Sequence, residues 1–185
     1  MIYIISALKA EANFLIEHFK LLKTDDKRFL IYQNSDIKLI ISGISKLNSA
    51  IATTYLLSKS LPTKSDKVIN IGLVGAKSDI NLGELFEVEK IINDSKVYHL
   101  KTTTKLKKAS ISCLDHVATK EYDLKSDLVD MESFGFYKAS KIFSKNIVIL
   151  KVVSDHLSDK ILSNQNIDQL FLKHIKSIED IMWIK

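Results

Sequence analysis

The segment 146–155, NIVILKVVSD, is apolar at almost every position and ends in a small residue and an acid. Its length and its β-branched residues are typical of a strand, and a strand with apolar side chains on both faces must be covered on both faces. The segments 2–8 (IYIISAL) and 67–72 (KVINIG) have the same character. The chain is therefore expected to fold around a sheet with protein packed on each side of it.

Amphipathic segments alternate with these strands, as a covered sheet requires. The spacing of apolar residues predicts helices over 10–22, 46–60, 132–143 and 166–184. Ser45 is the predicted N-cap of the helix over 46–60. Further strands, the first two as a hairpin, are predicted over 28–34, 37–43, 84–92, 110–117 and 127–131. We expect a three-layer α/β/α sandwich around a central mixed sheet. The length of the chain and its few glycine and proline residues predict a single domain over 1–185.

Charge and composition argue against several classes of function. The net charge is +5, but Arg28 is the only arginine and the lysines are dispersed. Proteins that read nucleic-acid sequence depend on the bidentate arginine fork, so we expect no nucleic-acid partner. No apolar run approaches the ~20 residues of a membrane span, and the first residues lack the basic region of a leader peptide. We expect no membrane partner, and the single Cys113 is typical of the reducing cytoplasm.

Acids stand at the ends of three predicted strands, where Glu11, Glu132 and Asp155 each end a strand or follow one closely. Ligands of such sheets bind at the carboxyl ends of the strands, so parallel strands would bring these acids to one edge. The alternative is helix capping, because the helix dipole stabilises an acid in the first turn. Taken singly, Glu11 and Asp155 fit capping, whereas Glu132 directly follows a buried strand beside Met131. Asp130 is interpreted as structural.

Five short segments then occur in a specific order along the chain. They are IISALKAEA (4–12), SGISKLNSA (42–50), INIGLVGA (69–76), VDMES (129–133) and VVSD (152–155). Together they resemble the nucleoside phosphorylase/nucleosidase superfamily, and most of all its bacterial 5′-methylthioadenosine/S-adenosylhomocysteine nucleosidases. The resemblance covers most of the chain. It implies a three-layer α/β/α fold and hydrolysis of the N-glycosidic bond of an adenine nucleoside.

The resemblance also implies a role for each matching acid. Glu11 matches the acid that activates the attacking water, and Asp155 matches the acid that hydrogen-bonds or protonates purine N7. Glu132 matches the acid that holds the ribose hydroxyls, and Met131 matches the residue packed against the sugar. These roles fit the reaction, because cleavage leaves oxocarbenium character on the ribose and moves negative charge into the base.

Other positions of the resemblance surround the base and the sugar. His116 and Val117 fall where the superfamily has an aromatic and an aliphatic residue around the base. The remaining positions expected to bind substrate are Leu73, Gly75 and Ser154. The resemblance implies a reaction without cofactor and a homodimer as the assembly. The spacing of the histidines does not match a metal site, so we expect no metal.

Departures from the superfamily pattern bear on the type of reaction. Phosphorylases of this superfamily need an anion cage, usually with arginine, and Arg28 lies near a predicted hairpin. A cage made of Lys46, Lys77 or backbone N–H groups is the alternative. Leu73 replaces a small hydroxyl residue that would contact phosphate, water or ribose. We therefore favour hydrolysis, with phosphorolysis as the second hypothesis.

Three further departures concern activity itself. Ser45 replaces the second glycine of the usual SGIGK, and Lys151 stands where close relatives often have arginine. The region 93–109 is much shorter than the corresponding loop, which helps form the subunit interface and the pocket for the sugar's 5′-substituent. A nucleoside-binding protein without efficient turnover is therefore a third hypothesis.

Overall fold

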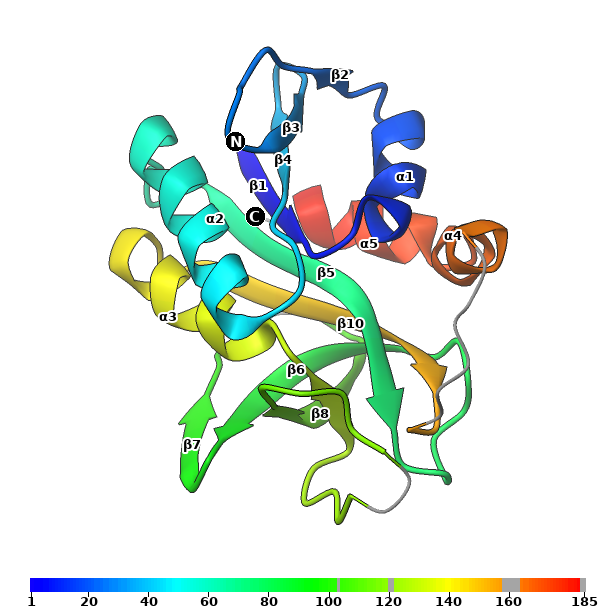
Figure 1. The fold of residues 1–185 in the computed structure, drawn as a ribbon. Helices are drawn as coiled ribbons and strands as arrows, with labels where there is room; N and C mark the ends of the chain where they lie inside the picture. Colours follow the sequence, from blue (N-terminus) through cyan, green and yellow to red (C-terminus); the bar gives the residue numbers. More distant parts are fainter. Residues whose placement is uncertain (103, 120–121, 158–163, 184–185) are drawn as a thin grey trace.

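The structure is a computed structural model that describes residues 1–102, 104–119, 122–157 and 164–183. Its helices are α1 (Lys9–His18), α2 (Lys46–Ser60), α3 (Ser133–Phe143), α4 (Asn164–Leu172) and α5 (Ile175–Trp183). Its strands are β1 (Ile2–Ser6), β2 (Leu22–Lys23), β3 (Leu30–Gln33), β4 (Ile37–Ile41), β5 (Lys67–Ala76), β6 (Leu85–Asn93), β7 (Lys96–His99), β8 (Lys107–Cys113), β9 (Leu128–Asp130) and β10 (Ile147–Asp155). Figure 1 shows β5 crossing the whole molecule.

All of these strands belong to one mixed sheet, as the sequence predicted. β4, β1, β5 and β10 run parallel to one another and form its centre. β10 also pairs with β6, β6 with β8, β8 with β9, and β9 with β5. Together with the pairing of β10 and β5, these four pairings close part of the sheet into a ring, which the hydrophobic pattern did not predict.

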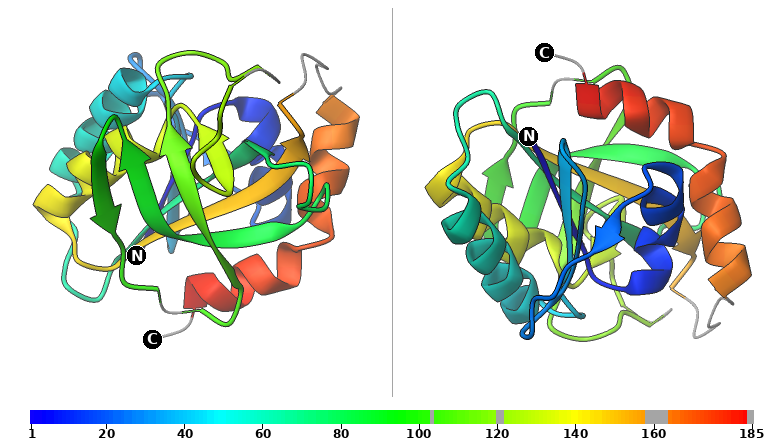
Figure 2. Two further views of the ribbon diagram at one scale, coloured as in Figure 1. Left: turned by 90° about the horizontal axis from the view of Figure 1, so that it is seen from below. Right: turned by 90° about the horizontal axis from the view of Figure 1, so that it is seen from above.

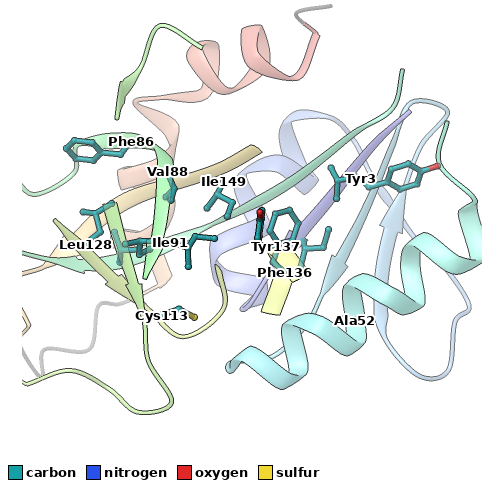
Figure 3. Close-up of a cluster of buried hydrophobic side chains, with 14 of the residues drawn as sticks. Tyr3, Ala52, Phe86, Val88, Ile91, Cys113, Leu128, Phe136, Tyr137 and Ile149 are labelled. Carbon is teal, nitrogen blue, oxygen red and sulfur yellow. The ribbon is translucent and has the colours of Figure 1, made fainter. Parts of the chain in front are cut away.

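Apolar side chains cover both faces of the sheet centre, because successive residues of a strand point to opposite faces. In β1, Tyr3 and Ile5 belong to a core beneath α2 and α3, which includes Phe136 (Figure 3). Ile2 and Ile4 belong to a second core beneath α1, α4 and α5. Figures 1 and 2 show the two groups of helices on opposite sides of the sheet. The predicted three layers are confirmed.

The C-terminal segment corrects the prediction of one helix over 166–184. It forms two helices, α4 and α5, and Ile184 lies outside the described residues. The break is at His174, whose N–H donates to the Phe171 carbonyl and whose Nε2 lies 2.7 Å from the Gly83 carbonyl oxygen. Phe171 stacks on Phe14 of α1, so α4 and α5 each bury a separate apolar face.

The region 93–109 contains a strand that sequence reasoning missed. β7 pairs antiparallel with β6 through a tight turn at Asp94, which has a φ of 55°. β7 has only four residues and is mostly exposed, so it lacks the longer apolar pattern from which a strand is predicted. No helix within the described ranges has both the length and the apolar character needed to cross a membrane.

Candidate active site

A cavity of about 300 Å³ opens beside the carboxyl-terminal half of β5. The nine residues named from the sequence as catalytic or substrate-binding all line its wall: Glu11, Leu73, Gly75, His116, Val117, Met131, Glu132, Ser154 and Asp155. They come from five separate parts of the chain. The structure therefore brings the nine together, and their individual roles stay predictions.

The acids converge for a reason different from the one predicted. β1 and β10 are parallel to β5, but β9 is antiparallel to it. β10 occupies one edge of β5, and β1 and β9 share the other edge, with β1 beside Lys67–Asn70 and β9 beside Gly75–Ala76. The carboxyl ends of β1 and β9 thus face each other across a gap in that edge. Glu11 and Glu132, which follow these two ends, meet there.

Glu11 lies in the first turn of α1 and is buried. Its Oε1 accepts a hydrogen bond of 3.0 Å from the Leu73 N–H, which lies in the gap between β1 and β9. Its Oε2 accepts hydrogen bonds from the Leu8 N–H and the Ser6 hydroxyl. Burial raises the pKa of the Glu11 carboxyl, although these donors and the charge of Lys151 oppose the shift. Glu11 is thus held in place on the cavity wall with little of its surface exposed.

Glu132 stands at the N-cap position of α3 and is also buried. Its Oε1 accepts a hydrogen bond of 2.9 Å from the Ser45 N–H, at the N-terminus of α2. Burial and the neighbouring Asp130 raise the pKa of Glu132 to about 7, against the opposing effect of Lys151. The carboxyl of Glu132 therefore changes its charge close to neutral pH.

Asp155 is the last residue of β10 and follows an irregularity in the pairing with β5. Its Oδ2 lies 2.7 Å from the hydroxyl of Ser154, which also lies 3.0 Å from the Val74 carbonyl oxygen. Gly75 faces this carboxyl, and a Cβ atom at Gly75 would lie only 2.9 Å from Leu157 Cδ2. Glycine at this position therefore leaves the room in which Asp155 and its neighbours line the cavity.

His116 and Val117 form an open side of the cavity. Val117 is 68% exposed, and the imidazole of His116 meets the ring of Tyr122 edge-on, with 6.3 Å between ring centroids. Met131 is half-buried between the two acids of its segment. A flat, partly apolar ligand is suited to lie between these side chains.

Asp130, which lines the cavity, and Lys151, which pairs with Asp130, were not among the predicted site residues. The Lys151 Nζ lies 2.8 Å from Asp130 Oδ2, and both side chains are 1% exposed. Burial alone would lower the pKa of Lys151, but the charges of Asp130 and Glu132 outweigh it and raise that pKa. The signal in the sequence was a lysine in the middle of the most apolar strand, because a buried lysine needs a partner.

Cations are scarce around this cavity. No lysine or arginine is among the described residues that line it. Lys46 pairs instead with Asp115 at 2.9 Å, and Arg28 is exposed in the connection between β2 and β3. The described part of the chain also holds no cluster of three or more histidine, cysteine or acidic side chains arranged for a metal ion.

Comparisons with known proteins agree with this architecture. No family model matches the chain. A curated 5′-methylthioadenosine/S-adenosylhomocysteine nucleosidase from Marinomonas sp. (strain MWYL1) is 36% identical over 69 residues, which is 37% of this chain and 26% of that protein. The match to this relative thus spans about a quarter of its length.

Solved structures match nearly the whole chain. The 5′-methylthioadenosine nucleosidase of Arabidopsis thaliana superposes with a TM-score of 0.83 at 19% identity, over 100% of this chain and 96% of that one. The Colwellia psychrerythraea nucleosidase in complex with adenine gives 0.80 at 16%, over 98% and 93%. The futalosine hydrolase of Helicobacter pylori gives 0.78 at 17%, over 97% of each chain. The chain therefore has the fold of these 5′-methylthioadenosine nucleosidases and of the futalosine hydrolase.

Proposed function

We propose that residues 1–185 form one nucleosidase domain that hydrolyses the N-glycosidic bond of an adenine nucleoside, such as 5′-methylthioadenosine or S-adenosylhomocysteine. The observation that carries the proposal is the convergence of Glu11, Glu132 and Asp155 on one cavity. The fold supports it, and so does the matching segment of the Marinomonas nucleosidase.

Each acid suits a different step of this reaction. Asp155 would hold a proton at purine N7 and neutralise the base as it leaves, an assistance of roughly 10²–10⁴-fold. Glu132, in its ionised form, would accept hydrogen bonds from the ribose hydroxyls and orient the sugar. Glu11 would take a proton from water as the water attacks the anomeric carbon. Neither a metal nor a cofactor has a step in this scheme.

The charge of the cavity wall supports hydrolysis rather than phosphorolysis. Four carboxylates line the wall, those of Glu11, Asp130, Glu132 and Asp155, and the described lining includes no lysine or arginine. A phosphate dianion would meet repulsion there, whereas a neutral water would not. The amide of Leu73, which a phosphate cage of backbone donors would need, is already bonded to Glu11.

The test is to incubate the protein with 5′-methylthioadenosine or S-adenosylhomocysteine, with and without phosphate, and to measure free adenine. The proposal expects adenine in both conditions at equal rates. Release that requires phosphate would support the phosphorylase instead. If the folded protein releases no adenine but is stabilised by adenine in a thermal shift assay, it binds nucleosides without turnover, and the proposed function is wrong.

We also propose that the protein acts as a homodimer in the cytoplasm. Ile44 lines the cavity and begins an exposed apolar stripe on α2, with Leu47 at 68% and Ile51 at 49% exposure. A second copy of the chain on this stripe would cover the apolar surface and the mouth of the cavity together.

Sedimentation tests the dimer. The wild-type protein is expected to sediment as a dimer at micromolar concentrations, and Leu47→Glu as a monomer. Leu22→Glu is the matched control, because Leu22 is similarly exposed but lies on β2, outside the α2 stripe. A monomeric wild-type protein, or a dimeric Leu47→Glu variant, would exclude this interface.

A further inference from the structure

The buried pair of Asp130 and Lys151 lies directly behind the acids of the cavity. Lys151 comes from β10 and Asp130 from β9, and their charged atoms are 2.8 Å apart with both side chains 1% exposed. Such burial is unfavourable for both ions, and a well-packed apolar pair is often as stable or more stable. A role in stability alone therefore gives little reason for a lysine at this place.

Asp130 has a structural partner that does not need the lysine. Its carboxylate accepts hydrogen bonds from the N–H and the hydroxyl of Ser133, the first residue of α3. This caps the helix, and the α3 dipole favours the same negative charge. The cap explains the acid, but it leaves the cation of Lys151 unexplained.

Lys151 faces Glu11 across Gly72. A Cβ atom at Gly72, the β5 partner of Lys151, would lie 3.4 Å from Lys151 Nζ and 3.4–3.5 Å from both carboxylate oxygens of Glu11. Both groups therefore border the space that a side chain at position 72 would occupy. The charge of Lys151 also acts on Glu132. One cation is thus in electrostatic contact with Asp130, Glu132 and Glu11, which come from β9, its end and α1.

We propose that Asp130 and Lys151 are positioning residues. Lys151 supplies the positive charge that lets Glu11 and Glu132 be ionised together, and Asp130 holds this charge in place. The proposal rests on the proposed function, because it assigns the pair to the reaction of those two acids. Without the cation, the buried carboxylates of Asp130, Glu132 and Glu11 would lack a counter-charge, and protons would bind to relieve their repulsion. Protonated Glu11 cannot take a proton from water, and protonated Glu132 loses acceptor capacity for ribose.

The two halves of the pair are expected to move the acid limb of the pH–rate profile in opposite directions. Lys151→Met removes the cation, so the limb moves to higher pH by about 1–2 units. Asp130→Asn removes an anion and keeps an acceptor for Ser133, so the limb moves to lower pH. Lys151→Arg keeps the charge and is expected to keep the wild-type limb. The double variant Asp130→Asn/Lys151→Met removes one charge of each sign and is expected to lie near the wild type.

A structural pair would give a different pattern, in which both single variants lose stability and neither moves the limb. Unchanged limbs in the folded single variants, or shifts of the same sign, would overturn the proposal. Should Lys151→Met fail to fold, Asp130→Asn decides alone, since a limb at wild-type pH contradicts the proposal and a lowered limb supports it.

A second readout does not depend on turnover. The carboxyl carbons of Glu11 and Glu132 can be titrated by NMR in the free protein after ¹³C labelling of glutamate. The same opposite shifts are expected there. If the wild type releases no adenine but these shifts occur, the proposed function fails and the electrostatic role of the pair stands. If adenine is released and the carboxyls titrate alike in all variants, the role of the pair is wrong.

Discussion

Each acid of the cavity has its own set of donors, and this difference gives chemically equal side chains different properties. Glu11 accepts three hydrogen bonds. Glu132 accepts one from the Ser45 N–H at the N-terminus of α2 and one from the Met131 N–H, and Asp155 lies beside the hydroxyl of Ser154. Asp130 is paired with Lys151. Because the surroundings of each carboxyl determine its pKa, the pH dependence of activity and stability can be traced to single residues.

Glu132 predicts how the stability of the protein depends on pH. Its pKa is about 7 in the folded state, above the ordinary value of 4.5. The folded protein therefore binds this proton more tightly than the unfolded chain, so its stability falls as the pH rises from about 4.5 to about 7. In the wild type, the loss of this proton is expected to cost the folded protein on the order of 2–3 kcal/mol of its free energy of unfolding over that pH range. The Glu132→Gln variant is expected to lack this loss of stability.

Urea denaturation of both proteins at pH 5 and pH 8 measures this difference. Glu89→Gln, a change at an exposed position of β6, is the matched control and should follow the wild type. If Glu132→Gln and the wild type lose the same free energy of unfolding between the two pH values, Glu132 does not titrate in that range. The variant is also expected to bind nucleosides more weakly, because a neutral amide replaces the carboxylate that is proposed to accept from the ribose hydroxyls.

Ser45 predicts a gain in stability on substitution by glycine. Its φ of 118° is strained for a residue with a side chain, by about 1–3 kcal/mol. Its hydroxyl caps α2 by accepting from the Asn48 N–H, but glycine is a nearly equal cap. Ser45→Gly is therefore expected to raise the free energy of unfolding by about 1 kcal/mol, measured by urea denaturation. Ser45→Ala keeps the strain and loses the cap, so it should be less stable than the wild type. A Ser45→Gly variant that is less stable than the wild type would show that no strain is stored here.

At the scale of the elements, the contact between α2 and α3 positions the side of the cavity on which Glu132 lies. The two helices meet where Gly135 of α3 faces the carbonyl of Lys46, and a Cβ atom at Gly135 would lie 1.9 Å from that oxygen. The neighbouring Ser45 N–H is the donor to Glu132. The close approach of the helices therefore determines where the carboxylate of Glu132 lies.

Gly135→Ala tests this contact. Alanine favours a helix by about 1 kcal/mol over glycine, but here its methyl group must push α2 away from α3. We expect a net loss of about 2–4 kcal/mol in the free energy of unfolding, and weaker nucleoside binding in whatever remains folded. Lys138→Ala, on the exposed side of α3, is the control and should change little. A stabilised Gly135→Ala variant would show that the helices do not need this approach.

At the scale of the whole molecule, β5 is the element around which the site is built. One edge of β5 is divided between β1 and β9, and the gap between them frees the Leu73 N–H for Glu11. The two cores on either side of the sheet hold this arrangement in place. The cavity thus lies at an interruption of the sheet, where the Leu73 N–H donates to a side chain instead of a strand.

The sequence predicted the layers and the acids because both have local signals. Apolar strands such as 146–155 require two covers, and an acid after a buried strand is visible in the order of residues. The direction of β9 has no local signal, since three residues pair equally well either way. The spacing of residues carries no signal for the closed ring of strands or for the Asp130–Lys151 pair, because both depend on contacts between distant segments. The apolar interior of the strand around Lys151 was the one available clue.

Three acids that are distant in sequence line one cavity, and they are proposed to cleave an N-glycosidic bond there. The most direct measurement is adenine release from 5′-methylthioadenosine in phosphate-free buffer by the wild type and by Asp155→Asn, with adenine binding and folding checked in both. The wild type is expected to release adenine, and the nearly isosteric variant is expected to bind but to lose at least about 10²-fold in rate. Equal rates in the two proteins, or no release by the folded wild type, would contradict the account.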